Sequence, residues 1–380
     1  MKSMLLGDIP FYFDMQKEPH NPEGIPDTYS FYICEDDNGV IVQRRSAETE
    51  EWLKAAYSFG SNISGLMDAG GIGNDYAQDF KKYILNKQDV QGKRVLDIGC
   101  GTGYLLKLLR DCGAMVEGVE PGEYGRIGRE KYQLNIKHGF FDCRDYKDKF
   151  DIIIFYGVLE HIGDYDAFLF DVRKLLNENG KIFIGVPDCE GYMQRGDASV
   201  FVAVHWNYFT ERTLKRALYS HSMACEMEKA GYGGAIYACC SIANNVQENT
   251  QEYDSCFDLD AFSRKVEQGR EKVRKFLEDC AGMSIGMYCP GRIINYYKNA
   301  VKTTNSKIRF FDDDQRFHGL YYPSIPIPME NYDDLKRAPV DIMLIVSTTF
   351  GEMLKQKCTA AGVEKCVLLK DLLDEDSDTL

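Results

Sequence analysis

The sequence predicts an α/β protein with a central unit and a C-terminal unit of mostly parallel sheet, preceded by a small N-terminal module. Short apolar segments alternate with helical segments in both units, which is typical of parallel sheets covered on both faces. At 380 residues the chain is also longer than one core usually supports. We expect an N-terminal module over 1–70, a central domain over 71–245, a helical linker over 246–280, a second α/β domain over 281–372 and an acidic tail from 373 to 380.

The N-terminal module is rich in proline, glycine and aromatic residues, and we expect it to be mostly irregular. Helical periodicity begins near Ala47 and continues through Trp52 and Tyr57. A further helix is predicted over 75–85. The module therefore leads into the central unit through helices.

The central unit shows the clearest alternation of strand and helix patterns. Strands are predicted over 94–98, 115–119, 150–155 and 181–186, and helices over 103–111, 123–132, 164–177 and 209–218. Thr210 is placed to cap the last of these helices. Two strand-like segments, over 224–229 and 234–240, complete the predicted sheet.

A second α/β pattern follows a change of composition near Ala243, where polar residues become frequent. A charged helix over 258–279 leads into a strand and loop over 283–292, and the pattern ends in a helix over 349–361. The order of strand, loop, helix and strand is Rossmann-like. The loop is poor in glycine and contains Pro290, so we do not expect this unit to bind a dinucleotide. We expect it to have a structural role or to help recognise a substrate.

The loop from Gly99 to Gly103 is the most informative segment, because it has glycine at alternate positions between a short apolar run and a helical pattern. Glycine lets the backbone approach a ligand closely, and the start of the next helix offers free N–H groups. The dinucleotide pattern G-x-G-x-x-G would need glycine at position 104, where the chain has Tyr104.

Two acids beside this loop predict the class of ligand. Asp97 directly precedes the loop, where a carboxylate would repel a pyrophosphate and attract an ammonium group. Glu120 ends the next apolar run and is well placed to bind the two hydroxyls of a ribose. S-adenosylmethionine has a ribose, an ammonium group and no phosphate, so we expect it as the cofactor. The alternative is a packing turn in some other α/β protein.

The order of these segments resembles that of the class I S-adenosylmethionine-dependent methyltransferases over roughly residues 75–235. The segments that resemble the family's motifs are 95–103, Glu120, 141–142, 150–162 and 175–187. The resemblance implies a class I methyltransferase sheet in the central domain. It also implies cofactor contacts from Asp97, Gly99, Cys100, Gly101, Gly103, Glu120, Phe141, Asp142, Tyr156 and Gly157.

A closer resemblance concerns the whole layout, which is similar to that of sugar C-methyltransferases acting on nucleotide-linked keto sugars. The segment Phe310–Pro328 follows that family's order of acids, glycine and a Pro-Ile-Pro ending. The family has an N-terminal zinc module with cysteine pairs, of which only Cys34 is present here. A structural zinc ion needs four such ligands, so we expect a degenerate zinc ribbon and no metal.

The candidate catalytic residues are His205 and His161, because histidine titrates near neutral pH and can accept the acceptor's proton. His205 matches a histidine of the resembling family, but Val202 and Val204 stand in the neighbourhood of its acidic and phenolic partners. His161 follows Glu160 at the end of the fourth predicted strand. Both histidines could instead have packing roles.

Glu160, Trp206 and Tyr208 are the residues expected to bind the acceptor. The two aromatic side chains could form a wall on which a sugar ring stacks, and they could equally belong to the core. The loss of partners beside His205 weakens carbon as the acceptor atom, since an enolate needs more stabilisation than a hydroxyl group.

Composition excludes several classes of partner. The net charge of −14, without a dense basic patch, disfavours nucleic acid as the acceptor. No apolar run approaches the roughly 20 residues of a membrane span, and the N-terminus lacks the apolar core of a signal peptide. We therefore expect a cytoplasmic protein whose scattered cysteines are reduced.

The leading hypothesis is methyl transfer to oxygen or carbon of a sugar, either nucleotide-linked or part of a surface glycan precursor. One alternative is a small-metabolite O-methyltransferase in which the C-terminal domain makes a homodimer. Another is a catalytically degenerate protein that binds the cofactor and serves as a partner in a biosynthetic cluster.

Overall fold

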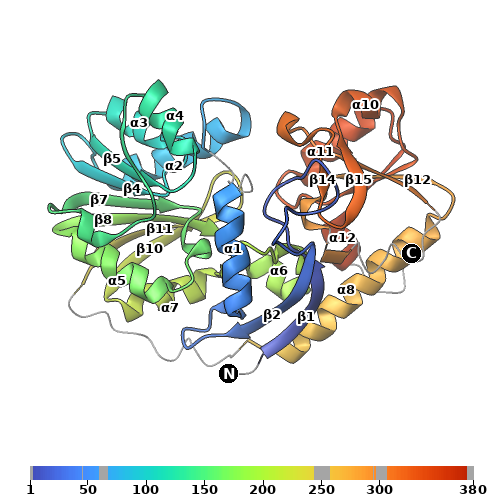
Figure 1. Ribbon diagram of the computed structural model, residues 1–380, viewed down its shortest axis with the longest axis horizontal. Helices are drawn as coiled ribbons and strands as arrows, with labels where there is room; N and C mark the ends of the chain where they lie inside the picture. The colour runs from blue at the N-terminus through green and yellow to red at the C-terminus, as the bar shows by residue number, and fades with distance from the viewer. Residues whose placement is uncertain are drawn as a thin grey trace.

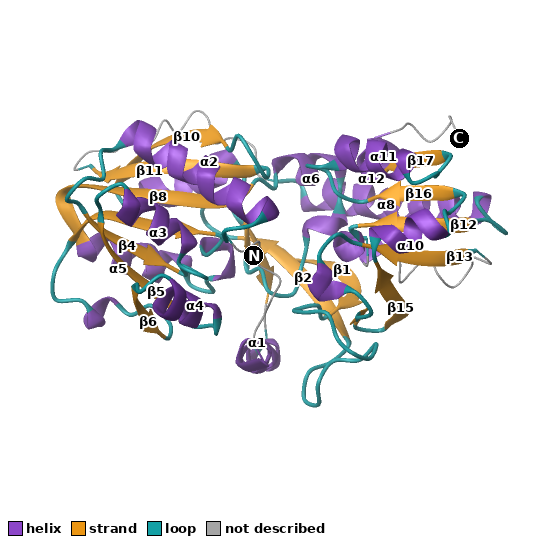
Figure 2. Ribbon diagram, turned by 90° about the horizontal axis from the view of Figure 1, so that it is seen from above, coloured by secondary structure: helices purple, strands orange, loops and turns teal. Residues whose placement is uncertain are grey.

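The computed structural model describes residues 3–44, 46–59, 67–243, 257–293, 295–296 and 306–374. These residues form three sheets. Figure 1 shows the central and C-terminal sheets in two lobes, with the N-terminal strands beneath and between them. Figure 2 shows the same arrangement from above, with β1 and β2 again between the lobes.

The central sheet has the alternating architecture that the sequence predicts. Its order is β10 (Met223–Lys229), β11 (Ala235–Ile242), β8 (Leu176–Pro187), β7 (Phe150–Tyr156), β4 (Arg94–Ile98), β5 (Met115–Glu120) and β6 (Asn135–His138). All neighbours pair in parallel except β11, which runs antiparallel to both β8 and β10. The strands β4 and β7 are buried along almost their whole length, as expected for strands covered on both faces.

The helices of this unit are α2 (Gly71–Lys87), α3 (Tyr104–Asp111), α4 (Tyr124–Lys131), α5 (Tyr165–Leu175), α6 (Glu190–Arg195) and α7 (Glu211–Ser220). The side chain of Thr210 accepts the backbone N–H of Thr213 and caps α7, as predicted. The predicted helix over 164–177 is too long, because Leu176 already pairs with Phe150 as the first residue of β8.

The N-terminal segment forms a sheet, so the expectation of a mostly irregular module is wrong. Its order is β1 (Ser3–Pro10), β2 (Thr28–Glu35), β3 (Ile41–Arg44) and β9 (Asn207–Tyr208), and α1 (Ala47–Phe59) follows β3. All of its pairs are antiparallel. The last strand comes from the middle of the chain, and such a distant partner gives no local signal in the N-terminal sequence.

The C-terminal sheet confirms the second α/β unit. Its order is β14 (Tyr321–Tyr322), β15 (Ile325–Glu330), β13 (Lys307–Phe311), β12 (Ser284–Tyr288), β16 (Ile342–Ile345) and β17 (Lys365–Leu368). The strands from β15 to β17 are parallel, and β14 pairs antiparallel with β15. The helices of this unit are α10 (Tyr332–Arg337), α11 (Gly351–Ala360) and α12 (Leu369–Asp374). The helix expected before β13 falls largely outside the described residues.

The expected acidic tail begins later than predicted, because residues 369–374 form α12. Leu372 and Leu373 on this helix are buried, and their burial holds the segment against the C-terminal unit. The rest of the expected tail lies outside the described residues.

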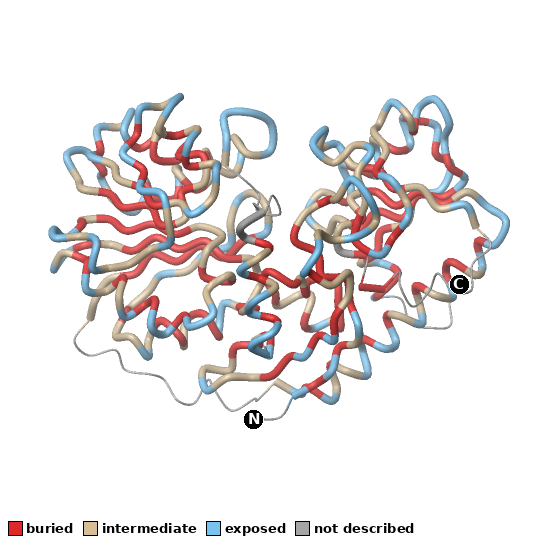
Figure 3. The backbone as a smooth tube through the Cα atoms, in the orientation of Figure 1, coloured by how far each residue is buried: buried red, intermediate tan, exposed pale blue. Residues whose placement is uncertain are grey.

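The long helix α8 (Leu259–Asp279) packs along β1 and joins the N-terminal sheet to the C-terminal unit (Figure 1). Its buried face includes Phe262 and Val266, and its Arg270 donates a hydrogen bond to the carbonyl of Leu6. One hydrophobic cluster contains residues of the N-terminal strands, of the segment 189–208, of α8 and of the C-terminal sheet. Figure 3 shows this buried region continuing between the two lobes. None of the helices that the structure describes has an apolar stretch long enough to cross a bilayer.

Candidate active site

The candidate site lies at the carboxyl ends of β4, β5 and β7. The strand β4 pairs with β5 on one side and with β7 on the other, so the order of the sheet reverses between β4 and β7. Open sheets of this kind bind ligands at such a reversal, outside the carboxyl ends of the strands. The glycine loop, Glu120 and Glu160 all follow strands that end here.

The glycine loop has the backbone that its glycines allow. Gly99, Gly101 and Gly103 have φ angles of 72°, 53° and 72°, in the left-handed region that other residues rarely adopt. A Cβ atom on Gly99 would lie 2.5 Å from Cγ2 of Val158, and one on Gly103 would lie 2.8 Å from Cδ1 of Ile136. Side chains at these positions would therefore clash, and the loop keeps its backbone open to a ligand.

The carboxylate of Glu120 is held at the edge of this loop. One of its oxygens accepts the N–H of Gly101 at 2.9 Å, and the other accepts the N–H of Gly122 at 2.7 Å. Asp97 lies close by and is 4% exposed, and burial followed by the charge of Glu120 raises its pKa well above the ordinary value. Two adjacent acids at a glycine loop fit a ligand that carries a positive charge, as the ammonium and sulfonium groups of S-adenosylmethionine do.

Cys100 turns toward the sheet. It is buried, and burial raises its pKa well above that of a free thiol. Its Sγ would lie 2.7 Å from a Cβ atom on Gly118, so its side chain fills space beside β5. Of the predicted cofactor contacts in the loop, Cys100 thus offers its backbone rather than its thiol.

Phe141 and Asp142 follow β6, and neighbouring residues engage both side chains. The ring of Phe141 packs 5.5 Å from that of Phe168 and 6.1 Å from that of Tyr146. Asp142 caps the short helix η1 (Cys143–Asp145) by accepting the N–H of Arg144 at 2.9 Å. Hydrogen bonds from Arg144 lower the pKa of Asp142 to about 2.

Tyr156 and Gly157 end β7. The ring of Tyr156 packs 5.0 Å from Phe80 and 6.2 Å from Tyr237, and burial raises the pKa of its hydroxyl. Gly157 has a φ of 65°, and a Cβ atom there would lie 3.8 Å from Oε1 of Glu160. The turn after β7 therefore brings the carboxyl group of Glu160 close to the end of the strand.

Glu160, His161 and His205 form one cluster, which we call the Glu–His–His cluster. One ligand atom from each lies within 4.8 Å of the others, and the two imidazole rings are 4.7 Å apart at 88°. Glu160 is 3% exposed, and burial raises its pKa to about 8. Its Oε2 has no hydrogen-bond partner among the described residues. The sequence singled out these residues, and the structure brings them together.

Backbone and side-chain hydrogen bonds fix the cluster. The N–H of Trp206 donates to the carbonyl of Glu160 at 2.6 Å, and Nδ1 of His161 lies 3.0 Å from the carbonyl of Val204. Because a carbonyl only accepts, Nδ1 of His161 carries the hydrogen and the lone pair is on Nε2. The loop that carries His205 and the turn that carries His161 are thus joined directly.

Asn207 is a residue of the site that the sequence analysis missed. Its amide nitrogen donates to the carbonyls of Leu159 and Ile162 at 2.9 and 2.7 Å, and the residue is 2% exposed. It therefore clamps η2 (Leu159–His161), the turn that carries two members of the cluster. The only available signal was its position two residues after His205.

The two aromatic residues expected at the acceptor occupy different places. Trp206 is half-buried, and its ring lies over Gly163, where a Cβ atom would approach it to 3.4 Å. Tyr208 is 1% exposed, and its hydroxyl donates to the carbonyls of Val202 and His205 at 3.1 and 3.3 Å. Tyr208 therefore supports the histidine loop from beneath, away from the surface that an acceptor could reach.

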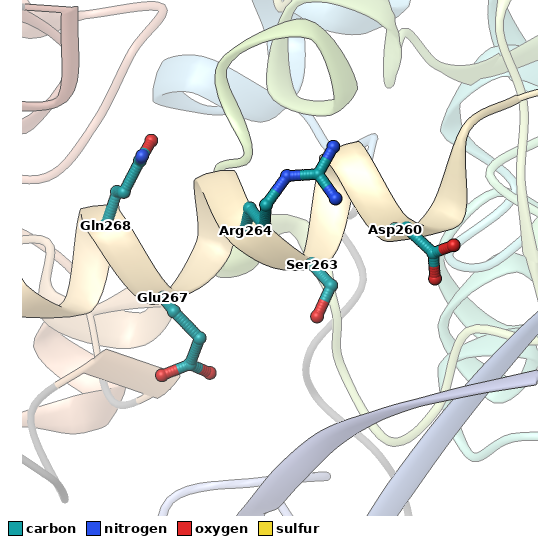
Figure 4. A pocket seen from close by; sticks show the side chains of 5 residues that line it. All are labelled: Asp260, Ser263, Arg264, Glu267 and Gln268. Atoms are coloured by element: carbon teal, nitrogen blue, oxygen red, sulfur yellow. The ribbon is translucent and has the colours of Figure 1, made fainter.

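A pocket of about 560 Å³ lies elsewhere, on the polar face of α8. Its lining residues are Asp260, Ser263, Arg264, Glu267 and Gln268. Figure 4 shows Glu267 and Gln268 pointing to opposite sides of this single helix. These side chains do not converge on a ligand, so the pocket plays no part in the candidate site.

Comparisons with known proteins agree with this location. Residues 72–223 match a family model described as a methyltransferase domain. Over 112 residues the chain is 35% identical to a ubiquinone biosynthesis O-methyltransferase of Coxiella burnetii, which covers 27% of this chain and 47% of that protein. Over 124 residues it is 33% identical to a tRNA U34 carboxymethyltransferase of Campylobacter hominis, covering 30% of this chain and 44% of that protein. The chain thus spans about half the length of these curated relatives.

Among solved structures, the chain is similar to a magnesium protoporphyrin IX methyltransferase from Synechocystis with bound SAH. The two share 18% sequence identity with a TM-score of 0.36, over 45% of this chain and 85% of the other. The family match covers the glycine loop, both acids and the Glu–His–His cluster. The segment that matches the methyltransferase-domain model, residues 72–223, therefore contains the whole candidate site.

Proposed function

We propose that the chain transfers a methyl group from S-adenosylmethionine to a hydroxyl group of a sugar, either nucleotide-linked or part of a glycan precursor. The observation that carries this proposal is the meeting of two features at one end of the central sheet. The glycine loop with its two acids fits the cofactor, and the Glu–His–His cluster offers groups that can take a proton.

Asp97, Glu120 and the glycine loop would hold the cofactor. The buried carboxyl group of Asp97 would attract the ammonium group, and Glu120 would bind the ribose hydroxyls. When bound, S-adenosylmethionine supplies a methyl group whose bond to sulfur breaks, with the electron pair staying on sulfur, as a bond to the acceptor oxygen forms. The loop's main contribution is then to hold the two reactants in line.

An imidazole of the cluster would accept the acceptor's proton. We assign this role first to His205 and second to His161, whose lone pair is on Nε2. Glu160 would stabilise the imidazolium that forms, since a positive charge nearby favours ionisation of a buried carboxyl group. The acceptor hydroxyl thereby loses its proton as its oxygen gains the methyl group.

The sugar as acceptor rests on three features. Trp206 directly follows His205, and its half-buried ring offers a face on which a sugar can stack. The C-terminal unit resembles that of sugar C-methyltransferases, and it touches the central unit where Tyr192 bonds Thr348 at 2.5 Å. Oxygen is favoured over carbon because Val202 and Val204 offer no polar side chain beside His205.

A small-metabolite O-methyltransferase is the second candidate. It is favoured by the 35% identity to a ubiquinone biosynthesis O-methyltransferase, although that match covers only 27% of this chain. The additional C-terminal unit favours the larger acceptor, because such a unit adds contacts that a small metabolite does not need.

The test is a methyl-transfer assay with labelled S-adenosylmethionine and a panel of nucleotide sugars and small phenols. We expect label to reach the hydroxyl group of a sugar, and transfer to phenols alone would support the second candidate. His205→Ala should abolish turnover while calorimetry shows unchanged affinity for the cofactor. His221→Ala is the matched control, because that histidine lies at the C-terminal end of α7 and bonds Asp166 of α5, outside the cluster. Unchanged turnover in His205→Ala would remove it as the base.

A further inference from the structure

We propose that Glu160, His161 and His205 bind one divalent transition-metal ion beside the cofactor site. One ligand atom from each residue lies within 4.8 Å of the other two. A carboxylate with two imidazoles is a ligand set that suits Zn²⁺, Mn²⁺ or Fe²⁺. The expectation of no metal rested on the missing cysteines of the N-terminal module, whereas this cluster uses nitrogen and oxygen ligands from the central domain.

Glu160 supplies an independent reason to place a cation here. Its side chain is 3% exposed, and Oε2 has no hydrogen-bond partner among the residues that the structure describes. A buried carboxyl oxygen without a partner is costly. A bound cation would satisfy this oxygen and would offset the cost of ionising the group.

His161 has the outer-shell hydrogen bond that metal-binding histidines usually have. Its Nδ1 donates to the carbonyl of Val204 at 3.0 Å, which leaves the lone pair on Nε2. Val204 directly precedes His205, so the same loop orients one histidine and carries the other.

The cluster is also held by its backbone. Asn207 binds the carbonyls that flank Glu160 and His161, and the N–H of Trp206 binds the carbonyl of Glu160. Ligands of one ion, each about 2.1 Å from it, lie about 3 to 3.4 Å apart. The ligand atoms here lie up to 4.8 Å apart, so the side chains would have to draw together when an ion binds.

The ion would change how the acceptor loses its proton, a consequence that rests on the proposed function. Three protein ligands leave open positions for the acceptor. A hydroxyl oxygen bound there would become more acidic and would release its proton to water. The imidazoles would then be metal ligands, and this proton release would replace the base role assigned to them above. Two adjacent hydroxyl groups, as on a sugar ring, would fill two of the ion's open coordination positions. The site therefore selects acceptors with neighbouring oxygen atoms.

Metal binding is tested first, without cofactor or acceptor. The full chain is freed of metal with a chelator and titrated with Co²⁺, followed by its visible absorption, and with Zn²⁺ in a calorimeter. We expect one ion per chain, bound at least 10-fold more weakly by Glu160→Gln, His161→Ala and His205→Ala. His221→Ala should bind normally. No binding by the wild-type chain, or equal binding by all three cluster variants, would overturn the proposal.

Two further measurements keep the outcomes separate. Calorimetry with S-adenosylmethionine on the same variants shows that they are folded, because the glycine loop is outside the cluster. Turnover of the chelated chain then tests the role of the ion. If chelation abolishes turnover and Zn²⁺ or Mn²⁺ restores it, the result supports a role of the ion in the reaction. Full turnover without metal would overturn that role. Metal binding without methyl transfer to any acceptor would count against the proposed function alone.

Discussion

At the scale of single residues, Glu160 has the most unusual environment in the candidate site. Burial raises its pKa from 4.5 to about 8, so in the metal-free folded chain it keeps its proton through neutral pH. In the unfolded chain the same group ionises above pH of about 4.3. Between these two pKa values the folded chain binds one proton more than the unfolded chain. The stability of the folded state therefore falls as the pH rises through this range.

Glu160→Gln should remove this pH-dependent loss of stability, because an amide does not titrate. In metal-free protein, the free energy of unfolding of the variant should equal that of the wild type near pH 4. Above pH 8 it should be larger by about 3 to 5 kcal/mol. Denaturant unfolding at several pH values measures the difference, and exposed Glu178→Gln is the control. A difference that stays constant with pH would mean that Glu160 is ionised in the folded chain.

At the scale of elements, Asn207 connects the short strand β9 to the turn η2. Asn207→Ala should destabilise the chain by about 2 to 4 kcal/mol, because two buried carbonyls lose a partner. Turnover should fall further than the change in stability alone explains, since the cluster loses its clamp. Thermal unfolding and the methyl-transfer assay measure both effects. Asn179→Ala, at an exposed position, should change stability by less than about 0.5 kcal/mol.

Elements with a clear apolar pattern of their own could be predicted, and contacts that depend on distant partners could not. The run from β4 to β8 showed clear alternation, whereas β6 was missed because only Ile136 among its four residues is buried. The strands β1, β2 and β3 were missed although each pairs with a neighbour in the chain, and β9 was missed because it has two residues and its partner β3 is distant. For the same reason the sequence predicted His161 and His205 only as separate candidates. The contact between their rings depends on a loop that long-range pairing holds in place.

At the scale of the whole molecule, the N-terminal sheet supports the loop that carries His205. The ring of Phe31 on β2 is fully buried 5.8 Å from that of Phe201, four residues before His205. Phe31→Ala should cost about 3 to 5 kcal/mol of stability. It should also lower turnover with little change in cofactor affinity, because the glycine loop belongs to another core cluster.

Thermal unfolding, calorimetry and the methyl-transfer assay together test this coupling. Tyr32→Ala is the matched control, because this neighbour points to the opposite face of β2 and is 38% exposed. Equal turnover in both variants would show that the N-terminal sheet does not influence the histidine loop.

The pairing of β3 with β9 joins the N-terminal sheet to the loop that carries His205 and Trp206. The N–H of Gln43 on β3 donates to the carbonyl of Trp206 at 2.8 Å, whereas Gly101 of the glycine loop donates to Glu120 on β5 of the central sheet. Under the proposed function, recognition of the acceptor would then depend on the N-terminal sheet, and recognition of the cofactor would not. Chimeras that exchange the first strands between homologous proteins should inherit a new acceptor preference and keep the same methyl source.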